Sequence, residues 1–372
     1  MFLPLLQDAG NLRGKRVLLR LDLDLSVENG VPRDTFRLER AGRTLRFLKE
    51  RGARTLIIGH IGRKREETLQ PVFEQVQRIV PAEFAATLVE AKAKMSNAQN
   101  GGFVMLENVR SFLGETENDP SFARELAALA DVYVNEAFAV SHREHASIVG
   151  IPPLLKSFAG FTFTEEVEHL SRVFSPAHPA LLVLGGAKFE TKIPIIERFL
   201  TIADTIYIGG ALANDIYRAR GYEVGVSLVS DFTINQALLD NSKLHVPSDV
   251  IVHTASENIE KSADNVGKTE KIVDAGSGAL ADVRALVGKA AFVIWNGPLG
   301  LYEEGFDAGT IALAQALAEC DAETIIGGGD SIVVVSKLGL LPRFSFVSTG
   351  GGAMLEFLAK QTLPGIAALL KK

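Results

Sequence analysis

The chain has 372 residues, of which 47% are hydrophobic, so it is long enough for two domains with buried cores. The formal net charge is −6, and charges of both signs are spread along the chain, which argues against nucleic-acid binding. The single cysteine, Cys320, excludes an intrachain disulfide, and no apolar run approaches transmembrane length. The N-terminal residues lack the basic region of a signal peptide. We therefore expect a cytoplasmic protein with no membrane partner.

The first half of the chain predicts strands that alternate with helices. The expected strands are residues 16–21, 55–58, 103–106 and 132–134, and the expected helices are 38–48, 72–79, 85–95 and 121–130. The strands are continuous apolar runs, which indicates burial on both faces of a parallel sheet. Alternation of this kind is typical of βαβ units in a doubly wound α/β fold.

The pattern stops at Pro152-Pro153 and restarts near residue 180. Residues 164–174 between these points have the periodicity of one helix, and the following strands are expected at 180–184, 205–208, 290–294, 324–326 and 344–347. We therefore predict an N-terminal domain over residues 1–155, an interdomain helix and linker over 156–178, and a C-terminal domain over 179–359.

Charged side chains follow the expected strands of the first half. Asp22 and Asp24 follow the first strand, and the basic residues of the later loops and the first helix are Arg37, His60, Arg63, Arg110, His142, Arg143 and His145. Open α/β sheets bind ligands at the carboxyl ends of their strands, and arginine suits bidentate capture of phosphate or carboxylate. Any one of these arginines alone would be a solvated surface residue. Their recurrence in separate loops predicts a small, multiply anionic ligand.

Glycine-rich turns dominate the second half. Two of them, within residues 325–331 and 347–353, lead from an expected strand into an expected helix, where backbone N–H groups and the helix dipole favour an anion. Lys188 and Lys192 follow a third glycine turn and are expected on one face of a new helix, within reach of phosphates. Asp330 is a candidate magnesium ligand, because magnesium needs only one or two carboxylates beside substrate phosphates. Simple loops are the alternative interpretation of the glycines.

Two common nucleotide motifs were considered. The P-loop pattern does not occur. Residues 276–281, Gly-Ser-Gly-Ala-Leu-Ala, match the dinucleotide-binding pattern, but the next expected strand ends in Asn296 where that motif needs an acid. An NAD-dependent dehydrogenase therefore remains a second hypothesis.

In their order along the chain, these motifs closely resemble those of phosphoglycerate kinase, from Arg16 to the C-terminus. The stretches that carry the resemblance are 106–110, 127–134, 142–147, 184–188, 295–298, 325–331 and 348–353. The resemblance implies two Rossmann-like domains joined by a helix, with an active-site cleft between them that closes for transfer. It also implies that residues 360–372 return to the N-terminal domain. The expected reaction is reversible phosphoryl transfer between 1,3-bisphosphoglycerate and ADP, giving 3-phosphoglycerate and ATP, by a monomer that uses Mg²⁺.

The resemblance assigns roles to particular residues. The substrate site corresponds to Asp22, Asp24, Arg37, His60, Arg63, Arg110 and Arg143. The residues that correspond to those contacting the transferring phosphoryl group are Arg37, Lys188, Gly328, Gly329 and Gly351. The nucleotide site corresponds to Lys188, Lys192, Gly209, Gly210, Ala211, Asn296, Glu303, Gly327, Gly328, Gly329, Asp330 and Ser331, with Asp330 as the metal ligand.

Several residues depart from the family pattern. Asp24 replaces an asparagine and adds a negative charge beside an anionic ligand, and we expect a nearby cation, Lys64 above all, to compensate it. Thr191 replaces an aspartate, Ala211 a glycine and Ser277 a proline, and Glu136 also alters a family motif. A family member with weakened activity or altered nucleotide preference is therefore a further alternative.

Overall fold

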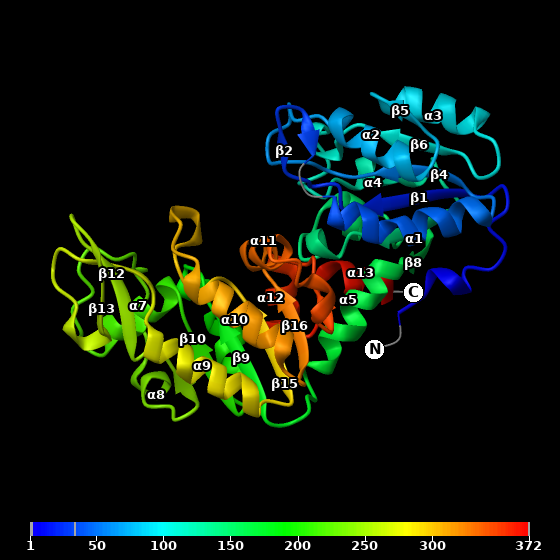
Figure 1. Cartoon of the computed structure of the whole chain (residues 1–372). Helices are drawn as coiled ribbons and strands as arrows, with labels where there is room; N and C mark the ends of the chain where they lie inside the picture. The colour runs from blue at the N-terminus through cyan, green and yellow to red at the C-terminus, as the bar shows by residue number, and fades with distance from the viewer. Residues whose placement is uncertain (1–2, 33–34, 371–372) are drawn as a thin grey trace. The chain divides into compact units, whose positions relative to one another are not determined.

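The computed structural model describes residues 3–32 and 35–370 (Figure 1). It divides into two compact units, residues 1–168 with 360–372, and residues 169–359. Residues 1–2 and 371–372, which the sequence analysis assigned to the first domain, lie outside the described residues. Each unit is built around its own six-stranded parallel sheet, so the α/β prediction is confirmed.

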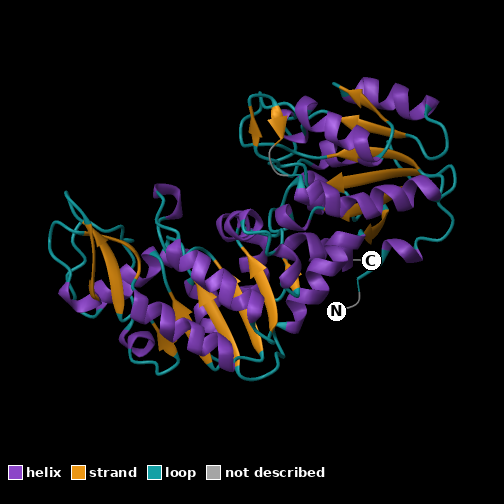
Figure 2. Ribbon diagram, in the orientation of Figure 1, coloured by secondary structure: helices purple, strands orange, loops and turns teal. Residues whose placement is uncertain are grey.

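The first unit has the strand order β5-β6-β4-β1-β7-β8, and every neighbouring pair is parallel (Figure 2). Its strands are β1 (Arg16–Leu21), β4 (Arg54–Ile58), β5 (Ala82–Ala85), β6 (Phe103–Leu106), β7 (Val132–Glu136) and β8 (Lys156–Ala159). Its helices are α1 (Phe36–Glu50), α2 (Gln70–Ile79), α3 (Leu88–Asn97), α4 (Pro120–Ala127) and α13 (Pro364–Leu370). A hairpin of β2 (Val27–Glu28) and β3 (Val31–Pro32) follows β1, and α5 (Phe161–Arg172) contains the boundary between the units.

The alternation of side chains along β1 explains its place at the centre of the sheet. Val17, Leu19 and Leu21 on one face share a buried cluster with Leu45 of α1 and Val76 of α2. Full burial of such a side chain contributes roughly 1.5–3 kcal/mol, which fixes the helices on this face. The opposite face of β1 is buried too, but it carries a charged residue, Arg20, whose side chain is fully buried.

The sequence analysis missed two strands of this sheet, β5 and β8. Both are four-residue strands at the edges of the sheet without a continuous apolar run; β5 pairs with β6, and β8 pairs with β7. The helix expected from residue 85 begins instead at Leu88, because Thr87 Oγ1 caps it by accepting the Glu90 N–H at 3.2 Å. Edge strands of this length give little sequence signal.

The second unit has the strand order β11-β10-β9-β15-β16-β17, again all parallel. Its strands are β9 (Ala180–Leu184), β10 (Thr205–Ile208), β11 (Leu244–His245), β15 (Phe292–Asn296), β16 (Glu323–Gly327) and β17 (Phe346–Val347). Its helices are α6 (Ile193–Phe199), α7 (Ala211–Ala219), α8 (Gln236–Leu239), α9 (Ser277–Lys289), α10 (Ala308–Glu319), α11 (Gly329–Lys337) and α12 (Gly352–Lys360). The order reverses between β9 and β15, which is where doubly wound sheets place their ligands.

A three-stranded antiparallel sheet, β13-β12-β14, belongs to the second unit and was not predicted. It consists of β12 (Asp249–His253), β13 (Asn258–Ser262) and β14 (Lys271–Ala275). β14 precedes the Gly-Ser-Gly motif, but the Gly278 and Ala279 N–H groups donate to the Asp249 carboxylate at 2.9 and 2.6 Å. The first turn of α9 is thus occupied by a carboxylate of the chain, and the motif does not follow a parallel strand. The only motif that favoured a dehydrogenase therefore lacks its structural context.

Other element bounds also differ from the predictions, for example those of the connecting helix and of β17. The connecting helix spans Phe161–Arg172 rather than 164–174, and β17 contains only Phe346–Val347, because residues 341–343 form a 3₁₀ turn. Among the described residues, no single helix is long and apolar enough to cross a bilayer. α12 and α13 pass that length and composition test only as a bent pair.

Candidate active site

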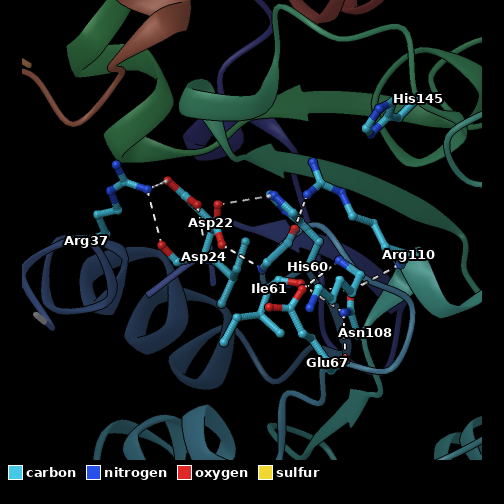
Figure 3. A network of polar contacts seen from close by, with 12 residues as sticks. Asp22, Asp24, Arg37, His60, Ile61, Glu67, Asn108, Arg110 and His145 are labelled. Atoms are coloured by element: carbon cyan, nitrogen blue, oxygen red, sulfur yellow. Dashed lines mark hydrogen bonds and ion pairs between the residues drawn. The ribbon is translucent and has the colours of Figure 1, made fainter. Parts of the chain in front are cut away.

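The carboxyl ends of β1, β4 and β6 bring together charged side chains of the first unit (Figure 3). Arg37 Nη1 lies 3.3 Å from Asp22 Oδ2. Burial raises the pKa of Asp22, and the nearby charges of Arg37 and Arg20 oppose that rise. The pair therefore places a half-buried guanidinium beside the end of β1, where it can face an anion.

His60, in the loop after β4, is held by the buried Arg20. Arg20 Nη2 lies 3.0 Å from His60 Nδ1, and the His60 side chain is itself buried. Burial lowers the pKa of His60 strongly, and the charges of Arg20, Arg110 and Arg143 lower it further. His60 is accordingly a neutral hydrogen-bonding group at neutral pH, not an additional cation.

Asp24 does not contact the Lys64 side chain, the cation that was expected above all to compensate it, and its charge acts on Arg110 instead. Its Oδ1 accepts the Gly62 N–H at 2.8 Å, and its Oδ2 lies 3.6 Å from His60 Nε2 (Figure 3). Arg37 Nη1 contacts the backbone oxygen of Asp24 at 3.4 Å, not its carboxylate. The Asp24 carboxylate is stabilised by a backbone amide and ties the loop after β1 to the loop after β4.

Asn108 organises the loop that carries Arg110. Its side-chain amide donates to the backbone oxygens of Ile61 at 3.0 Å and Glu67 at 2.8 Å, and its Oδ1 accepts the Arg110 N–H at 3.1 Å. Arg110 Nη1 donates to the Gly62 backbone oxygen, whereas its buried Nη2 has no hydrogen-bond partner among the described residues. Because a buried unpaired donor is costly, this nitrogen fits a site that an anionic oxygen fills.

The remaining substrate-site candidates are exposed. Arg63 follows β4, and Arg143 lies in the loop after β7. The charge of Arg143 contributes to the lowered pKa values of His60 and Arg110, so it lies within electrostatic reach of both. The structure thus gathers Asp22, Asp24, His60, Arg37 and Arg110 by direct contacts and Arg143 by its charge.

In the second unit, the two lysines after β9 occupy different environments. Lys188 is exposed and has left-handed backbone geometry, with φ 65°. Lys192 is buried, and its Nζ donates to Asn296 Oδ1 at 2.9 Å. Burial lowers the pKa of Lys192 to about 8, and the charge of Asp330 opposes this. A 3₁₀ turn separates the lysines before α6 begins at Ile193, so the prediction of one shared helical face is wrong.

The glycines of the predicted phosphate loops fall into two groups. Gly327 has no room for a side chain, because a Cβ there would lie 2.0 Å from Met354 Sδ. Gly329 and Gly351 instead face open space, and Gly328 has a φ of 93° at the N-cap of α11. Packing explains the glycine at Gly327, whereas the backbone at Gly329 and Gly351 is accessible to a ligand.

Three other nucleotide-site candidates are buried beneath these loops. Ser331 Oγ accepts the Gly297 N–H at 3.1 Å. Asn296 holds Lys192, as described above, and Gly209 is also buried, with Leu299 Cδ2 at 2.5 Å from the position of a Cβ. Ser331 and Asn296 therefore support the glycine-rich loops by buried hydrogen bonds, and Gly209 allows close packing against Leu299.

An open pocket of about 200 Å³ gathers the remaining nucleotide-site candidates. Ala211, Glu303 and Asp330 all line it, and Gly210 and Ala211 line a neighbouring pocket. Asp330 lies in the first turn of α11, is exposed, and accepts the Tyr302 hydroxyl at 2.9 Å. One exposed carboxylate beside accessible glycine backbone fits magnesium, which takes few protein ligands and keeps waters and phosphates. Within residues 3–32 and 35–370, no group of three or more His, Cys, Asp or Glu side chains could hold a metal alone.

The sequence analysis did not single out several supporting residues. These are Arg20, Asn108, Glu115, Ser147 and Tyr302. Arg20 could have been found, because an arginine inside the apolar run Val17–Leu21 has to be buried with partners. The partners themselves could not, since Ser147 lies 127 positions away along the chain.

Comparisons with known proteins agree with one another. The family model described as "Phosphoglycerate kinase" matches residues 6–361. Curated proteins named phosphoglycerate kinase from Rubrobacter xylanophilus and Herpetosiphon aurantiacus are 39% and 40% identical to this chain, and each alignment covers 96% of it and 96% and 97% of those proteins. Solved phosphoglycerate kinase structures from Coxiella burnetii and Pyrococcus horikoshii are 34% and 29% identical, with TM-scores of 0.84 and 0.88; each match covers 99% of this chain and 99% and 98% of those chains. The chain belongs to the phosphoglycerate kinase family.

Proposed function

We propose that the chain is a phosphoglycerate kinase, which transfers a phosphoryl group from the acyl phosphate of 1,3-bisphosphoglycerate to ADP and catalyses the reverse reaction. Full-length similarity at close to 40% identity is the observation that carries the proposal. The arrangement of candidate residues supports it, because arginines gather in the first unit and open glycine turns in the second.

The first unit is the proposed phosphoglycerate site. Arg37 and Arg110 supply guanidinium groups, and Arg110 Nη2 has the unmet hydrogen-bonding capacity that a phosphate or carboxylate oxygen would use. Arg63 and Arg143 add exposed positive charge, and the neutral His60 adds a hydrogen-bond donor. A triply or more highly charged small anion is the ligand class that this set suits.

The second unit is the proposed nucleotide site. Gly210 and Ala211 would border the base, Glu303 the ribose, and Lys188 with the turns at Gly328–Gly329 and Gly351 the phosphates. Asp330 would hold Mg²⁺, which when bound neutralises phosphate charge. Lys192, Asn296 and Ser331 would support these groups from the buried side.

The reaction needs no protein nucleophile. In the direction of ATP formation, a terminal oxygen of the ADP β-phosphate attacks the phosphorus of the acyl phosphate, the P–O bond to the carboxyl group breaks, and 3-phosphoglycerate leaves with that electron pair. Catalysis is then alignment together with stabilisation of charge on the equatorial oxygens. Arg37 and Lys188 are the proposed charges, and the backbone N–H groups of the glycine turns are the proposed donors.

A steady-state assay tests this proposal, with 3-phosphoglycerate and MgATP as substrates and acyl phosphate formation as the readout. Arg37→Ala should lower kcat by about 100-fold or more while changing KM for 3-phosphoglycerate much less, because its charge is needed most during transfer. Arg143→Ala should mainly raise that KM. A wild-type protein without activity would reject the proposal, and unchanged kinetics in both variants would reject the substrate-site assignment.

A further inference from the structure

Arg20 is a fully buried cation with defined acceptors. Nη1 donates to the backbone oxygen of Leu21, Nε donates to Ser147 Oγ at 2.9 Å, and Nη2 lies 3.0 Å from His60 Nδ1. The side chain emerges from β1 on the face opposite Leu19 and Leu21. Its guanidinium is therefore held on each of its three nitrogens and has a fixed orientation.

The contact with Arg20 determines the protonation of His60. A guanidinium can only donate hydrogen bonds, so Nδ1 must accept. The ring proton is then on Nε2, and a doubly protonated ring would set two donors against each other. Nε2 lies 3.6 Å from Asp24 Oδ2, too far for a hydrogen bond, so its N–H remains available to a ligand oxygen.

Behind Arg20, the buried carboxylate of Glu115 fixes Ser147. The Ser147 hydroxyl donates to Glu115 Oε1 at 2.6 Å, and the Ser147 N–H donates to Glu115 Oε2 at 2.9 Å. The single proton of the Ser147 hydroxyl is used in the hydrogen bond to Glu115. Ser147 Oγ is therefore left to accept the hydrogen bond from Arg20 Nε–H. His145 Nδ1, at 3.7 Å from Glu115 Oε1, is too far to compete for it.

Most of the charged groups that surround His60 favour the neutral ring. Arg20, Arg110, Arg143 and His145 contribute positive or potentially positive charge, whereas the negative charge of Asp24 favours the charged ring. Burial has the largest effect and also disfavours the imidazolium. The exposed Asp24 carboxylate is bound by the Gly62 amide and does not reverse this balance.

We propose that Glu115, Ser147 and Arg20 form a buried hydrogen-bonded relay that holds His60 in the Nε2–H form and orients it toward the substrate. Glu115, Ser147 and Arg20 are thus positioning residues, which act through one another on His60. The relay joins the loop after β6, the turn at residues 146–150, the end of β1 and the loop after β4. Its role in substrate binding rests on the proposed function, whereas the tautomer of His60 does not.

Nitrogen NMR of the full-length protein without substrate tests the relay directly. Long-range ¹H–¹⁵N spectra distinguish a protonated from an unprotonated ring nitrogen, and His60→Asn identifies the His60 signals. We expect wild-type His60 to be protonated on Nε2 alone and to show no titration from pH 5 to pH 8. Ser147→Ala removes the acceptor of Arg20 Nε and loosens the orientation of the guanidinium, so the Nδ1–H tautomer of His60 should appear beside the Nε2–H form.

Ser141→Ala is the matched control. Ser141 is also buried and its hydroxyl donates to the Ala137 backbone oxygen, but it does not contact Arg20. Glu115→Gln provides a second test, because it retains the shape of the side chain and weakens its hold on Ser147. Protonation of wild-type His60 on Nδ1, or an unchanged single tautomer in Ser147→Ala, would overturn the proposal.

Kinetics then test the role of the relay in binding. Ser147→Ala should raise KM for 3-phosphoglycerate by about three- to tenfold and change kcat by less than about twofold, as expected for one weakened hydrogen bond. Ser141→Ala should leave both constants unchanged. If the protein has no activity with this substrate, the proposed function fails while the NMR result still decides the relay. A selective loss of kcat would contradict a positioning role in binding.

Discussion

At the scale of single residues, the residue types were predictable from the sequence but their partners were not. The sequence predicts Asp24 as a negative charge beside an expected anion site, and in the structure its Oδ2 lies 3.6 Å from Nε2 of His60, another candidate residue of that site. Its stabilisation by the Gly62 amide depends on a backbone group 38 positions away, which no side-chain pattern reveals. Lys64 was a reasonable partner by charge, but only its backbone N–H is engaged, with Glu67.

The position of Asp24 predicts that removing its charge strengthens the binding of 3-phosphoglycerate. Asp24→Asn keeps an oxygen that can accept the Gly62 N–H, while it removes repulsion of an anionic substrate. We expect KM for 3-phosphoglycerate to fall by about two- to tenfold, which corresponds to at most about 1.4 kcal/mol. Lys64→Met should act additively with it in a double-mutant cycle. An increased KM in Asp24→Asn would show that the carboxylate assists binding.

At the scale of elements, strong periodicity predicted the central strands and their helices, whereas the edge strands, the helix caps and the first residues of the helices could not be predicted from the sequence. The start of α5 is an example. The buried Glu136, at the end of β7, accepts the N–H groups of Thr162 and Phe163 at 3.0 and 3.3 Å and the Thr44 hydroxyl at 2.7 Å. Nothing in residues 156–163 indicates that the cap comes from a carboxylate more than 20 positions earlier.

This cap predicts a cost when Glu136 is shortened. Glu136→Ala leaves two helix N–H groups and one hydroxyl without their acceptor, and it should lower the free energy of unfolding by about 1–3 kcal/mol. Glu168→Ala removes an exposed glutamate from the same helix and should change stability by less than about 0.5 kcal/mol. Urea denaturation measures both. Equal free energies of unfolding for the two variants would contradict the role of Glu136 as the cap of α5.

The same residue predicts a pH dependence. Burial raises the pKa of Glu136 in the folded protein, so the folded state binds its proton more tightly than the unfolded state does. This contribution to stability is present below the unfolded pKa, near 4.5, and is lost as pH rises through the folded pKa. Relative to Glu136→Gln, the wild type should therefore become more stable as pH falls toward 4.5, as measured by urea denaturation. A difference that does not change with pH would contradict the raised pKa.

At the scale of the whole molecule, the alternation of strands and helices predicted the α/β fold, and ordered motifs over nearly the full chain predicted the family. The substrate-site candidates all belong to the first unit and the nucleotide-site candidates to the second. The antiparallel sheet β13-β12-β14 could not be predicted from the family motifs, because none of them lies within residues 249–275. The domain bounds, the monomeric state and the metal ligand stay predictions.

Magnesium dependence tests the nucleotide side. Asp330→Ala should raise the Mg²⁺ concentration needed for half-maximal activity by about tenfold or more and weaken MgADP binding in calorimetry. Asp321→Ala, an exposed aspartate just before β16, is the matched control and should leave both unchanged. Tyr302→Phe removes the hydroxyl that contacts Asp330 and should have a smaller effect. If MgADP binds Asp330→Ala as tightly as wild type, Asp330 is not a magnesium ligand.

The most direct measurement follows the phosphoryl group itself. Wild-type protein would be incubated with MgATP that carries ¹⁸O in its γ-phosphate and with 3-phosphoglycerate, and the acyl phosphate would be trapped with hydroxylamine as its hydroxamate. Direct transfer predicts hydroxamate formation that requires 3-phosphoglycerate and Mg²⁺, is nearly abolished in Arg37→Ala, and releases inorganic phosphate that retains three ¹⁸O atoms from ATP. Consumption of ATP without hydroxamate, or no consumption of ATP at all, would contradict the assignment of this chain as a phosphoglycerate kinase.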